Sequence, residues 1–194
     1  GAEQYVPTQQ TQGGRFYVDP ELTLYVSEVG QKMARVSDRP DLPYEFVVLN
    51  SSVPNAWALP GGKIAINRGL LTELDDEAQL ASVLGHEIVH AAARHSVQRM
   101  QQGMLISAGV AGLGFALSDN EWAGLIMGGA ALGAQLALAQ YSQGDELESD
   151  HYGIIYMKEA GYDPQAAVEL QELFLKLSEG RQSSFIDGLF ATHP

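Results

Sequence analysis

The chain has 194 residues, of which 45% are hydrophobic and 18% are charged, a size and composition typical of one globular domain and not of a disordered segment. Its formal net charge of -13 argues against binding to nucleic acid and against electrostatic docking on anionic lipid, because both need a basic surface. It contains no cysteine, which excludes disulfides, thiolate metal ligands and a cysteine nucleophile.

The N-terminal part of the chain begins with a polar stretch, which is followed by a helix-forming sequence. Residues 1–15 are rich in Gln, Thr and Gly and predict a loose N-terminal arm, which leaves residues 16–194 as a single domain. A helix is expected to begin at Asp19-Pro20, because Asp caps helix N-termini and Pro fits the first helical position.

Two stretches predict β-structure. Tyr44–Asn50 is aromatic and β-branched, which is typical of a strand. The stretch AWALPGGKIAINRGLL predicts a hairpin, with two short extended runs around Gly61-Gly62. The fold class that we expect is therefore α+β, mostly helical, with a small β-sheet.

The rest of the chain predicts helices. Residues 72–102 are expected to form one long helix, acidic at its start and basic towards its end. We interpret the Gly/Ala-rich residues 104–139 as a non-spanning helical hairpin that contacts a membrane or a partner protein. A further helix follows from DELESD to Gly161, and another is capped by Asp163. The chain then stops abruptly at FATHP, as a truncated domain would.

The stretch Ala81–His95, ASVLGHEIVHAAARH, holds the motif H-E-x-x-H among uncharged residues. His86 and His90 are four residues apart, so their imidazoles share one helix face and can reach one metal ion. Glu87 can then act as a general base on a water molecule bound to that metal. A helix can also bury histidines without a metal, but a chance H-E-x-x-H is expected in only about one such chain in a hundred. The motif therefore predicts a zinc site.

His95 is the third histidine of this stretch, and we do not expect it to bind the metal. In the extended three-histidine pattern, glycine stands at the position of Ala93 and the last histidine at that of Ser96. On a continuous helix His95 lies ~140° round from His90. We therefore expect His95 to point elsewhere, to a hydrogen bond or to solvent.

A third ligand has to come from another helix, and the acidic stretch DELESDHYG offers candidates. Glu146 and Asp150 are four residues apart and share a face, whereas Glu148 lies about 200° away and is expected to face solvent. One carboxylate could complete the ligand set, and the other could hold a ligand imidazole through its free N–H. From the spacing alone, Glu146 and Asp150 could exchange these two roles. The alternative is an acidic helix start that has no metal-binding role.

Four stretches together resemble the M48 family of zinc metallopeptidases: NAWALPGGKIAINRGLL, LASVLGHEIVHAAARH, YSQGDELESDHYG and the terminal ATHP. In order and approximate spacing they cover most of residues 44–194. H-E-x-x-H is shared by many zincins, and the E-x-E-x-D element and the PGG hairpin make the resemblance more specific. It implies a gluzincin-like zincin with one Zn²⁺ between two helices and a small sheet beside them.

The resemblance also assigns roles. It implies that Glu146 is the third zinc ligand and that Asp150 stands behind a ligand imidazole. It implies peptide hydrolysis, in which Glu87 takes a proton from zinc-bound water and passes it to the leaving amine. Two positions depart from the family: Ser149 stands where Ala is common, and Gln143 where Arg is common. The second departure removes a charge near the site.

The substrate strand and the terminal histidine complete the candidate site. An extended peptide could pair with an edge strand, and the residues we select for this are Asn55, Ala56, Trp57 and Ala58; a purely structural hairpin is the alternative. His193 is a further catalytic candidate. It could bind the metal as a fourth ligand that blocks water, hydrogen-bond the developing oxyanion, or have no role.

The leading hypothesis is a zinc metalloendopeptidase that acts on misfolded or envelope proteins. The resemblance is to the soluble, envelope-type branch and implies a place in the bacterial cell envelope, in the periplasm. The alternative is a zinc-containing chaperone-like or binding protein with a plugged, weakly active site; a zinc hydrolase of non-peptide substrates is a third reading. Expected partners are protein or peptide substrates, with peripheral membrane or envelope-protein contact through residues 104–139.

Overall fold

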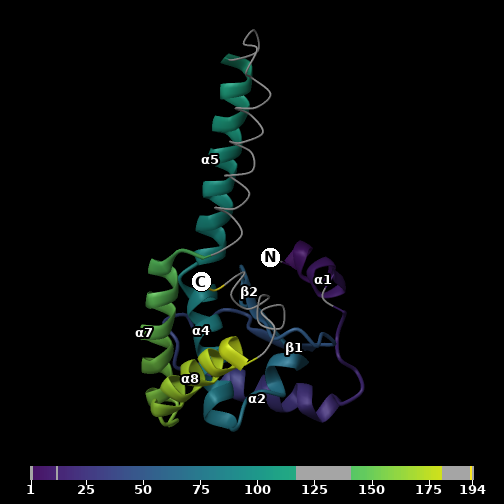
Figure 1. Cartoon of the computed structure of the whole chain (residues 1–194), viewed down its shortest axis with the longest axis vertical. Coiled ribbons are helices and arrows are strands. Elements are labelled where there is room, and N and C mark those ends of the chain that lie inside the picture. The colour runs from purple at the N-terminus through teal and green to yellow at the C-terminus, as the bar shows by residue number, and fades with distance from the viewer. Residues whose placement is uncertain (1, 12, 117–140, 181–192, 194) are drawn as a thin grey trace.

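The computed structural model describes residues 2–11, 13–116, 141–180 and 193. In chain order its elements are α1 (Ala2–Thr11), α2 (Pro20–Ala34), β1 (Glu45–Leu49), β2 (Ala56–Leu59), β3 (Lys63–Asn67), α3 (Arg68–Leu71), α4 (Glu77–Ala92), α5 (His95–Ala116), α7 (Gln143–Glu159) and α8 (Gln165–Gly180). Helices dominate and the described strands form one small sheet, so the predicted α+β class is confirmed. Figure 1 shows α5 projecting away from the sheet and the helices packed on it.

The sheet has the order β1-β3-β2. β2 and β3 form the predicted antiparallel hairpin, while β1 runs parallel to β3 with Glu45 opposite Lys63. Gly61 and Gly62 make the hairpin turn with φ angles of 89° and 80°, a left-handed conformation that glycine adopts without strain. In the order β1-β3-β2, β2 lies at an edge of the sheet that the described residues form.

The core lies mainly between the sheet and helices α2 and α4. Along β1 the side chains alternate between the two faces of the sheet. Phe46 and Val48 join the main cluster on the helix side, while Val47 and Leu49 belong to a second cluster on the opposite face. The main cluster includes the fully buried side chains of Met33, Ile64, Ile66, Leu84 and Ile88.

The predicted starts of α2 and α8 agree with the structure to within one residue. Asp19 Oδ1 accepts a hydrogen bond from Leu22 N at 3.0 Å, which caps α2. Asp163 Oδ1 accepts from Gln165 N at 2.9 Å, and α8 begins at that Gln, one residue after the predicted first position. α7 ends just before Gly161, which has a φ of 84°.

The single long helix expected over residues 72–102 is wrong. The structure has two helices there, and the chain turns sharply between them at Ala93 and Arg94. Arg94 has a φ of 63°, the left-handed conformation that ends a helix. Neither glycine nor proline marks this turn, so the strongest sequence signals for a helix end are missing there.

Within the segment that we expect to be an N-terminal arm, residues 2–11 form helix α1. Gln9 is buried, and its side-chain oxygen accepts a hydrogen bond from Arg15 Nε at 2.9 Å. Arg15 in turn bridges to Leu49 of β1. The division of the chain at residue 16 stays a prediction.

The Gly/Ala-rich region falls only partly within the described residues. Residues 104–116 form the outer part of α5, and residues 117–140 lie outside the described part of the chain, as does most of ATHP. Among the described helices, none combines the length and the apolar character needed to cross a lipid bilayer.

Candidate metal centre

Helix α4 carries the H-E-x-x-H motif through the middle of the fold. Asp76 caps its start, with Oδ1 accepting from Gln79 N at 2.8 Å. The helix packs against α2, α7, α8 and the sheet, which explains why the residues around the motif are uncharged and mostly buried. His86 and His90 project from the same face, and their Nε2 atoms lie 3.0 Å apart.

Helix α7 brings an acid to these histidines. A capping box fixes its first turn: Ser142 Oγ accepts from Asp145 N at 3.1 Å, and Asp145 Oδ2 accepts from Ser142 N at 3.0 Å. Glu146 follows directly in that turn. Further along, Gly153 lies against α4, where an added Cβ atom would be 3.2 Å from the backbone nitrogen of His86. Glycine at this position permits the close approach of the two helices.

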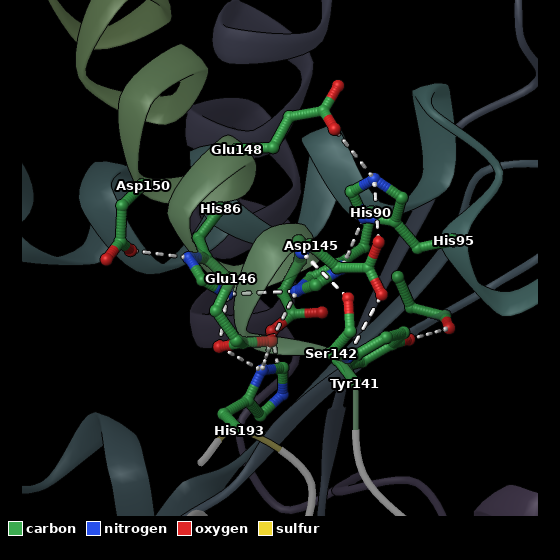
Figure 2. A network of polar contacts seen from close by, with 12 residues as sticks. His86, His90, His95, Tyr141, Ser142, Asp145, Glu146, Glu148, Asp150 and His193 are labelled. Carbon is green, nitrogen blue, oxygen red and sulfur yellow. Dashed lines mark hydrogen bonds and ion pairs between the residues drawn. The ribbon is translucent and has the colours of Figure 1, made fainter. Parts of the chain in front are cut away.

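Four side chains converge where α4 and α7 meet, as Figure 2 shows: His86, His90, Glu146 and His193. Glu146 Oε2 lies 3.4 Å from His86 Nε2, and Glu146 Oε1 lies 3.2 Å from both His90 Nε2 and His193 Nδ1. The ligand atoms of a tetrahedral zinc ion, with bonds of about 2.0–2.2 Å, are about 3.4 Å apart. The spacing and chemistry of these residues therefore fit a zinc ion.

Burial and mutual hydrogen bonds shift the pKa values of these groups. Burial opposes the ionisation of Glu146, but hydrogen bonds from His193, His86 and His90 outweigh it and hold the carboxyl pKa well below its usual range. Burial also opposes the charged form of His86 and so lowers its pKa, but hydrogen bonds with Asp150 and Glu146 raise the pKa to about 10. At His90 burial dominates and lowers the pKa to about 3. In the described state the ionised Glu146 carboxylate is therefore paired with a cationic His86, and a metal ion bound here would replace the His86 proton as its positive partner.

Glu87 lies beside this cluster and is only 2% exposed. Its Oε1 is 3.5 Å from His193 Nε2, and its Oε2 is buried without a hydrogen-bond partner among the described residues. Burial raises the pKa of Glu87, against the opposing charges of His193 and His86. A buried carboxyl group with a free oxygen and a raised pKa is suited to exchanging a proton with water or substrate.

The outer contacts of the two helix histidines differ. His86 Nδ1 is 2.9 Å from Asp150 Oδ1, the contact expected of an acid that orients a ligand imidazole. His90 Nδ1 is instead 2.9 Å from His95 Nδ1. His95 lies outside the four-residue cluster and makes a hydrogen bond, as expected, but its expected position ~140° round from His90 is wrong, because it assumed a continuous helix and the chain turns at Arg94. Glu148 is exposed as expected, although its Oε2 lies 3.5 Å from His95 Nε2.

Tyr141 was not among the predicted site residues. It is 4% exposed and its ring stacks on that of His90, with centroids 3.9 Å apart and planes 18° apart. The residue precedes α7 and follows the Gly/Ala-rich region, so no helical spacing relates it to the histidines. No sequence pattern that we recognise would have selected it.

Strand β2 runs next to the cluster, so the predicted substrate strand and the metal site lie together. Asn55 O accepts from Asn67 N on the β3 side. The carbonyls of Ala56 and Ala58 point to the other side, because carbonyl directions alternate along a strand. There Ala56 O accepts from His193 Nε2 at 3.3 Å, and Ala58 O accepts from Tyr141 Oη at 3.4 Å.

A cavity of about 340 Å³ opens from the cluster towards α8. Apolar side chains of α4, α7 and α8 form much of its wall, and side chains of the cluster also line it. The lining residues include Leu70, Val83, Ile154, Val168, Leu170 and Phe174, together with His86, Glu87, Glu146, Asp150 and His193.

Comparison with known proteins gives consistent matches. The model of peptidase family M48 matches residues 20–194. The beta-barrel assembly-enhancing protease of Yersinia pestis is 32% identical over 182 residues, which cover 91% of this chain and 37% of that protein. Mitochondrial metalloendopeptidase OMA1 of Schizosaccharomyces pombe is 34% identical over 174 residues (89% and 49%), and metalloprotease LoiP of Escherichia coli K12 is 31% identical over 151 residues (75% and 57%). This chain therefore spans less than two thirds of each of these relatives.

Proposed function

Because the chain belongs to peptidase family M48, we propose that it is a zinc metalloendopeptidase in which His86, His90 and Glu146 hold one Zn²⁺ per chain. The convergence of the two α4 histidines with Glu146 of α7, at 3.0–3.4 Å, is the observation that carries the proposal. Imidazole nitrogen and carboxylate oxygen are ligands that zinc prefers. Three protein ligands would leave a fourth position for water or substrate.

The proposed mechanism assigns one task to each residue. When bound, the zinc ion would polarise the scissile carbonyl and lower the pKa of a water ligand. Glu87 accepts a proton from the attacking water and later donates it to the leaving amine nitrogen. Its burial raises its pKa, which suits both transfers. Asp150 accepts a hydrogen bond from His86 Nδ1 and thereby turns Nε2 towards the cluster.

We propose that an extended peptide binds along β2, through Asn55, Ala56, Trp57 and Ala58. Two features support this: β2 is an edge strand of the described sheet, and the carbonyls of Ala56 and Ala58 point away from β3 on the side where the cluster lies. Main-chain hydrogen bonds with those carbonyls would hold the peptide in register and place its scissile bond near Glu87.

We propose that the cavity beside the cluster receives a bulky apolar side chain of that peptide. His86, Glu87 and Glu146 are among its lining residues, so a side chain that enters lies close to the bond being cut. Apolar residues such as Val168 and Phe174 line the α8 side, where an apolar group would be favoured over a charged one.

His193 is proposed to block the site in the state described. Its Nδ1 contacts Glu146 Oε1 at 3.2 Å, and its Nε2 donates to Ala56 O at 3.3 Å. One ring therefore occupies both the cluster and a carbonyl at which a peptide would pair. This favours the blocking role over the oxyanion role, since an oxyanion donor would need a free N–H.

The names of relatives suggest where such a peptidase would act. The Yersinia pestis relative is a beta-barrel assembly-enhancing protease, so we propose that this chain serves protein quality control in the bacterial cell envelope, in the periplasm. Its substrates would be misfolded or unassembled proteins of that compartment. Contact of residues 104–139 with a membrane or an envelope protein is part of the same proposal.

Metal analysis and casein cleavage test the proposal. We expect one zinc ion per purified chain, and cleavage that is lost with a chelator and restored by zinc. Glu87→Gln should keep the zinc and lower cleavage by about 10²–10⁴-fold, because it removes the group that moves the proton. The matched control is Glu169→Gln, an exposed acid on α8, which should cleave like wild type. Wild-type cleavage by Glu87→Gln would sink the peptidase proposal.

The contacts of His193 also favour a second candidate, a zinc-containing chaperone-like or binding protein whose site stays plugged. The two candidates differ in the cell. A peptidase needs Glu87 for its physiological role, whereas a binding protein does not. Complementation of a deletion strain by Glu87→Gln, at the level of wild type, would favour the binding protein.

A further inference from the structure

His95 is brought to the metal cluster by the turn between α4 and α5. Arg94 adopts a φ of 63°, and α5 then begins at His95, so this side chain folds back towards α4. It is 2% exposed, and its Nδ1 lies 2.9 Å from His90 Nδ1. Its Nε2 faces two acids of α7, at 3.7 Å from Asp145 Oδ1 and 3.5 Å from Glu148 Oε2 (Figure 2).

The direction of the hydrogen bond between the two histidines follows from their other contacts. His90 Nε2 faces the cluster, and a nitrogen that binds a metal carries a lone pair and no proton. Neutral His90 must then carry its proton on Nδ1 and donate it. His95 Nδ1 must accept, which puts the proton of His95 on Nε2, opposite carboxylates that can only accept. Each N–H group in this series of contacts therefore faces an atom that can accept its hydrogen bond.

We propose that His95 is a positioning residue for the metal site: its Nδ1 accepts the Nδ1–H of His90, which fixes the tautomer and the ring orientation of that ligand. The proposal rests on the assignment of His90 as a zinc ligand. In this arrangement the Nδ1 atom of His90 contacts the imidazole of His95, which in turn faces two carboxylates. The Nδ1 atom of His86 contacts the carboxylate of Asp150 directly.

Two neighbouring features support this role. Tyr141 stacks on the face of the His90 ring, which limits tilting, but a stacked ring accepts no hydrogen bond from Nδ1. Only His95 among the described residues contacts that nitrogen at hydrogen-bond distance. The left-handed conformation of Arg94 is uncommon for a residue with a Cβ atom, and retained strain of this kind clusters at functional sites.

Zinc affinity tests the proposal without measuring catalysis. His95→Leu fills the space with an apolar side chain of similar size and removes the acceptor, so we expect zinc to bind about 10–100-fold more weakly in competition with a chromophoric chelator. His95→Gln can still accept from His90 through its side-chain oxygen and should recover most of the affinity. His151→Leu, an exposed histidine on α7, is the matched control and should bind like wild type. The melting temperature of the metal-free chain separates these effects from a folding defect.

A measurement on the unaltered chain guards against a variant that fails to fold. Long-range ¹H–¹⁵N NMR of the zinc-loaded wild type should show the proton of His95 on Nε2 and that of His90 on Nδ1. A proton on His95 Nδ1, or wild-type zinc affinity in folded His95→Leu, overturns the role of His95 alone. A wild-type chain that binds no zinc overturns the proposed function together with it.

Discussion

Gly153 of α7 lies so close to His86 of α4 that a Cβ atom at position 153 would be 3.2 Å from the backbone nitrogen of the histidine. The same Cβ would lie 3.5 Å from the backbone carbon of Gly85. The neighbours are main-chain atoms of a buried helix, which cannot rotate out of the way. The distance between the two helices, and hence between the histidines and Glu146, depends on this contact.

We therefore predict that Gly153→Ala lowers the free energy of unfolding of the metal-free chain by about 1–3 kcal/mol, the usual cost of overpacking. It should also weaken zinc binding, because α7 carries Glu146. Gly109→Ala is the control, since a Cβ there on α5 meets nothing within 4 Å and alanine is the better helix former. Urea unfolding measures the stability of both variants. A Gly153→Ala variant as stable as Gly109→Ala would contradict the packing argument.

The part of the site that lies on one regular helix could be predicted from the sequence. The four-residue spacing of His86 and His90 places both rings on one face, and α4 is helical throughout that motif. The place of Glu146 depends on how α7 packs on α4. Spacing within α7 could not distinguish it from Asp150, and the family resemblance provided the choice.

The missed features depend on irregular backbone or on tertiary contacts. The turn at Arg94 lacks glycine and proline, so the helix was expected to continue and His95 was placed on the wrong side. The stacking of Tyr141 on His90 arises only when the segment before α7 returns to the cluster. The hairpin followed from its turn residues, but nothing in the strands indicates that β1 pairs with β3 in parallel.

His193→Ala should raise peptidase activity if this ring blocks the site. A peptide must displace its contacts with Glu146 and Ala56, and relief of about 1–1.4 kcal/mol corresponds to about a fivefold to tenfold rise in kcat/KM. Cleavage of casein and of a short fluorogenic peptide measures the change. Tyr141→Phe removes the hydroxyl group that donates a hydrogen bond to Ala58 O, and so tests the neighbouring contact. A clear loss of activity in His193→Ala would support the oxyanion role instead.

The cavity predicts selectivity for apolar side chains. Val168→Asp puts a charge into the cavity wall, and we expect kcat/KM for a peptide with a bulky apolar residue to fall by about 10–100-fold. Leu175→Asp is the control, because this residue lies on the same helix, is 60% exposed and is not part of the cavity lining. Equal effects of the two substitutions would contradict the assignment of the cavity.

A separate polar cluster links α2, the start of α4 and the segment between α7 and α8, away from the metal centre. Glu77, in the first turn of α4, accepts hydrogen bonds from Tyr162 Oη at 2.6 Å and from Tyr25 Oη at 2.8 Å. These bonds, that of Tyr162 first, lower the pKa of Glu77 below 4.5. The bonded form is the carboxylate, so its contribution to stability is complete above that pH and is lost as the pH falls through the lowered pKa.

Tyr162→Phe should therefore destabilise the metal-free chain by about 1 kcal/mol at neutral pH, the low end for a bond to a charged but exposed group. The difference from wild type should shrink as the pH falls below the ordinary carboxyl pKa and then through the lowered pKa of Glu77 in the folded chain. Phenylalanine keeps the ring on which Lys32 Nζ lies, 3.9 Å from the centroid, so the substitution removes only the hydroxyl bond. Urea unfolding at neutral pH and at an acidic pH, where Glu77 is protonated, measures the effect. Tyr17→Phe, on a side chain that is 77% exposed, is the control. A loss of stability in Tyr162→Phe that is the same at both pH values would show that packing, and not the bond to the ionised carboxylate, is responsible.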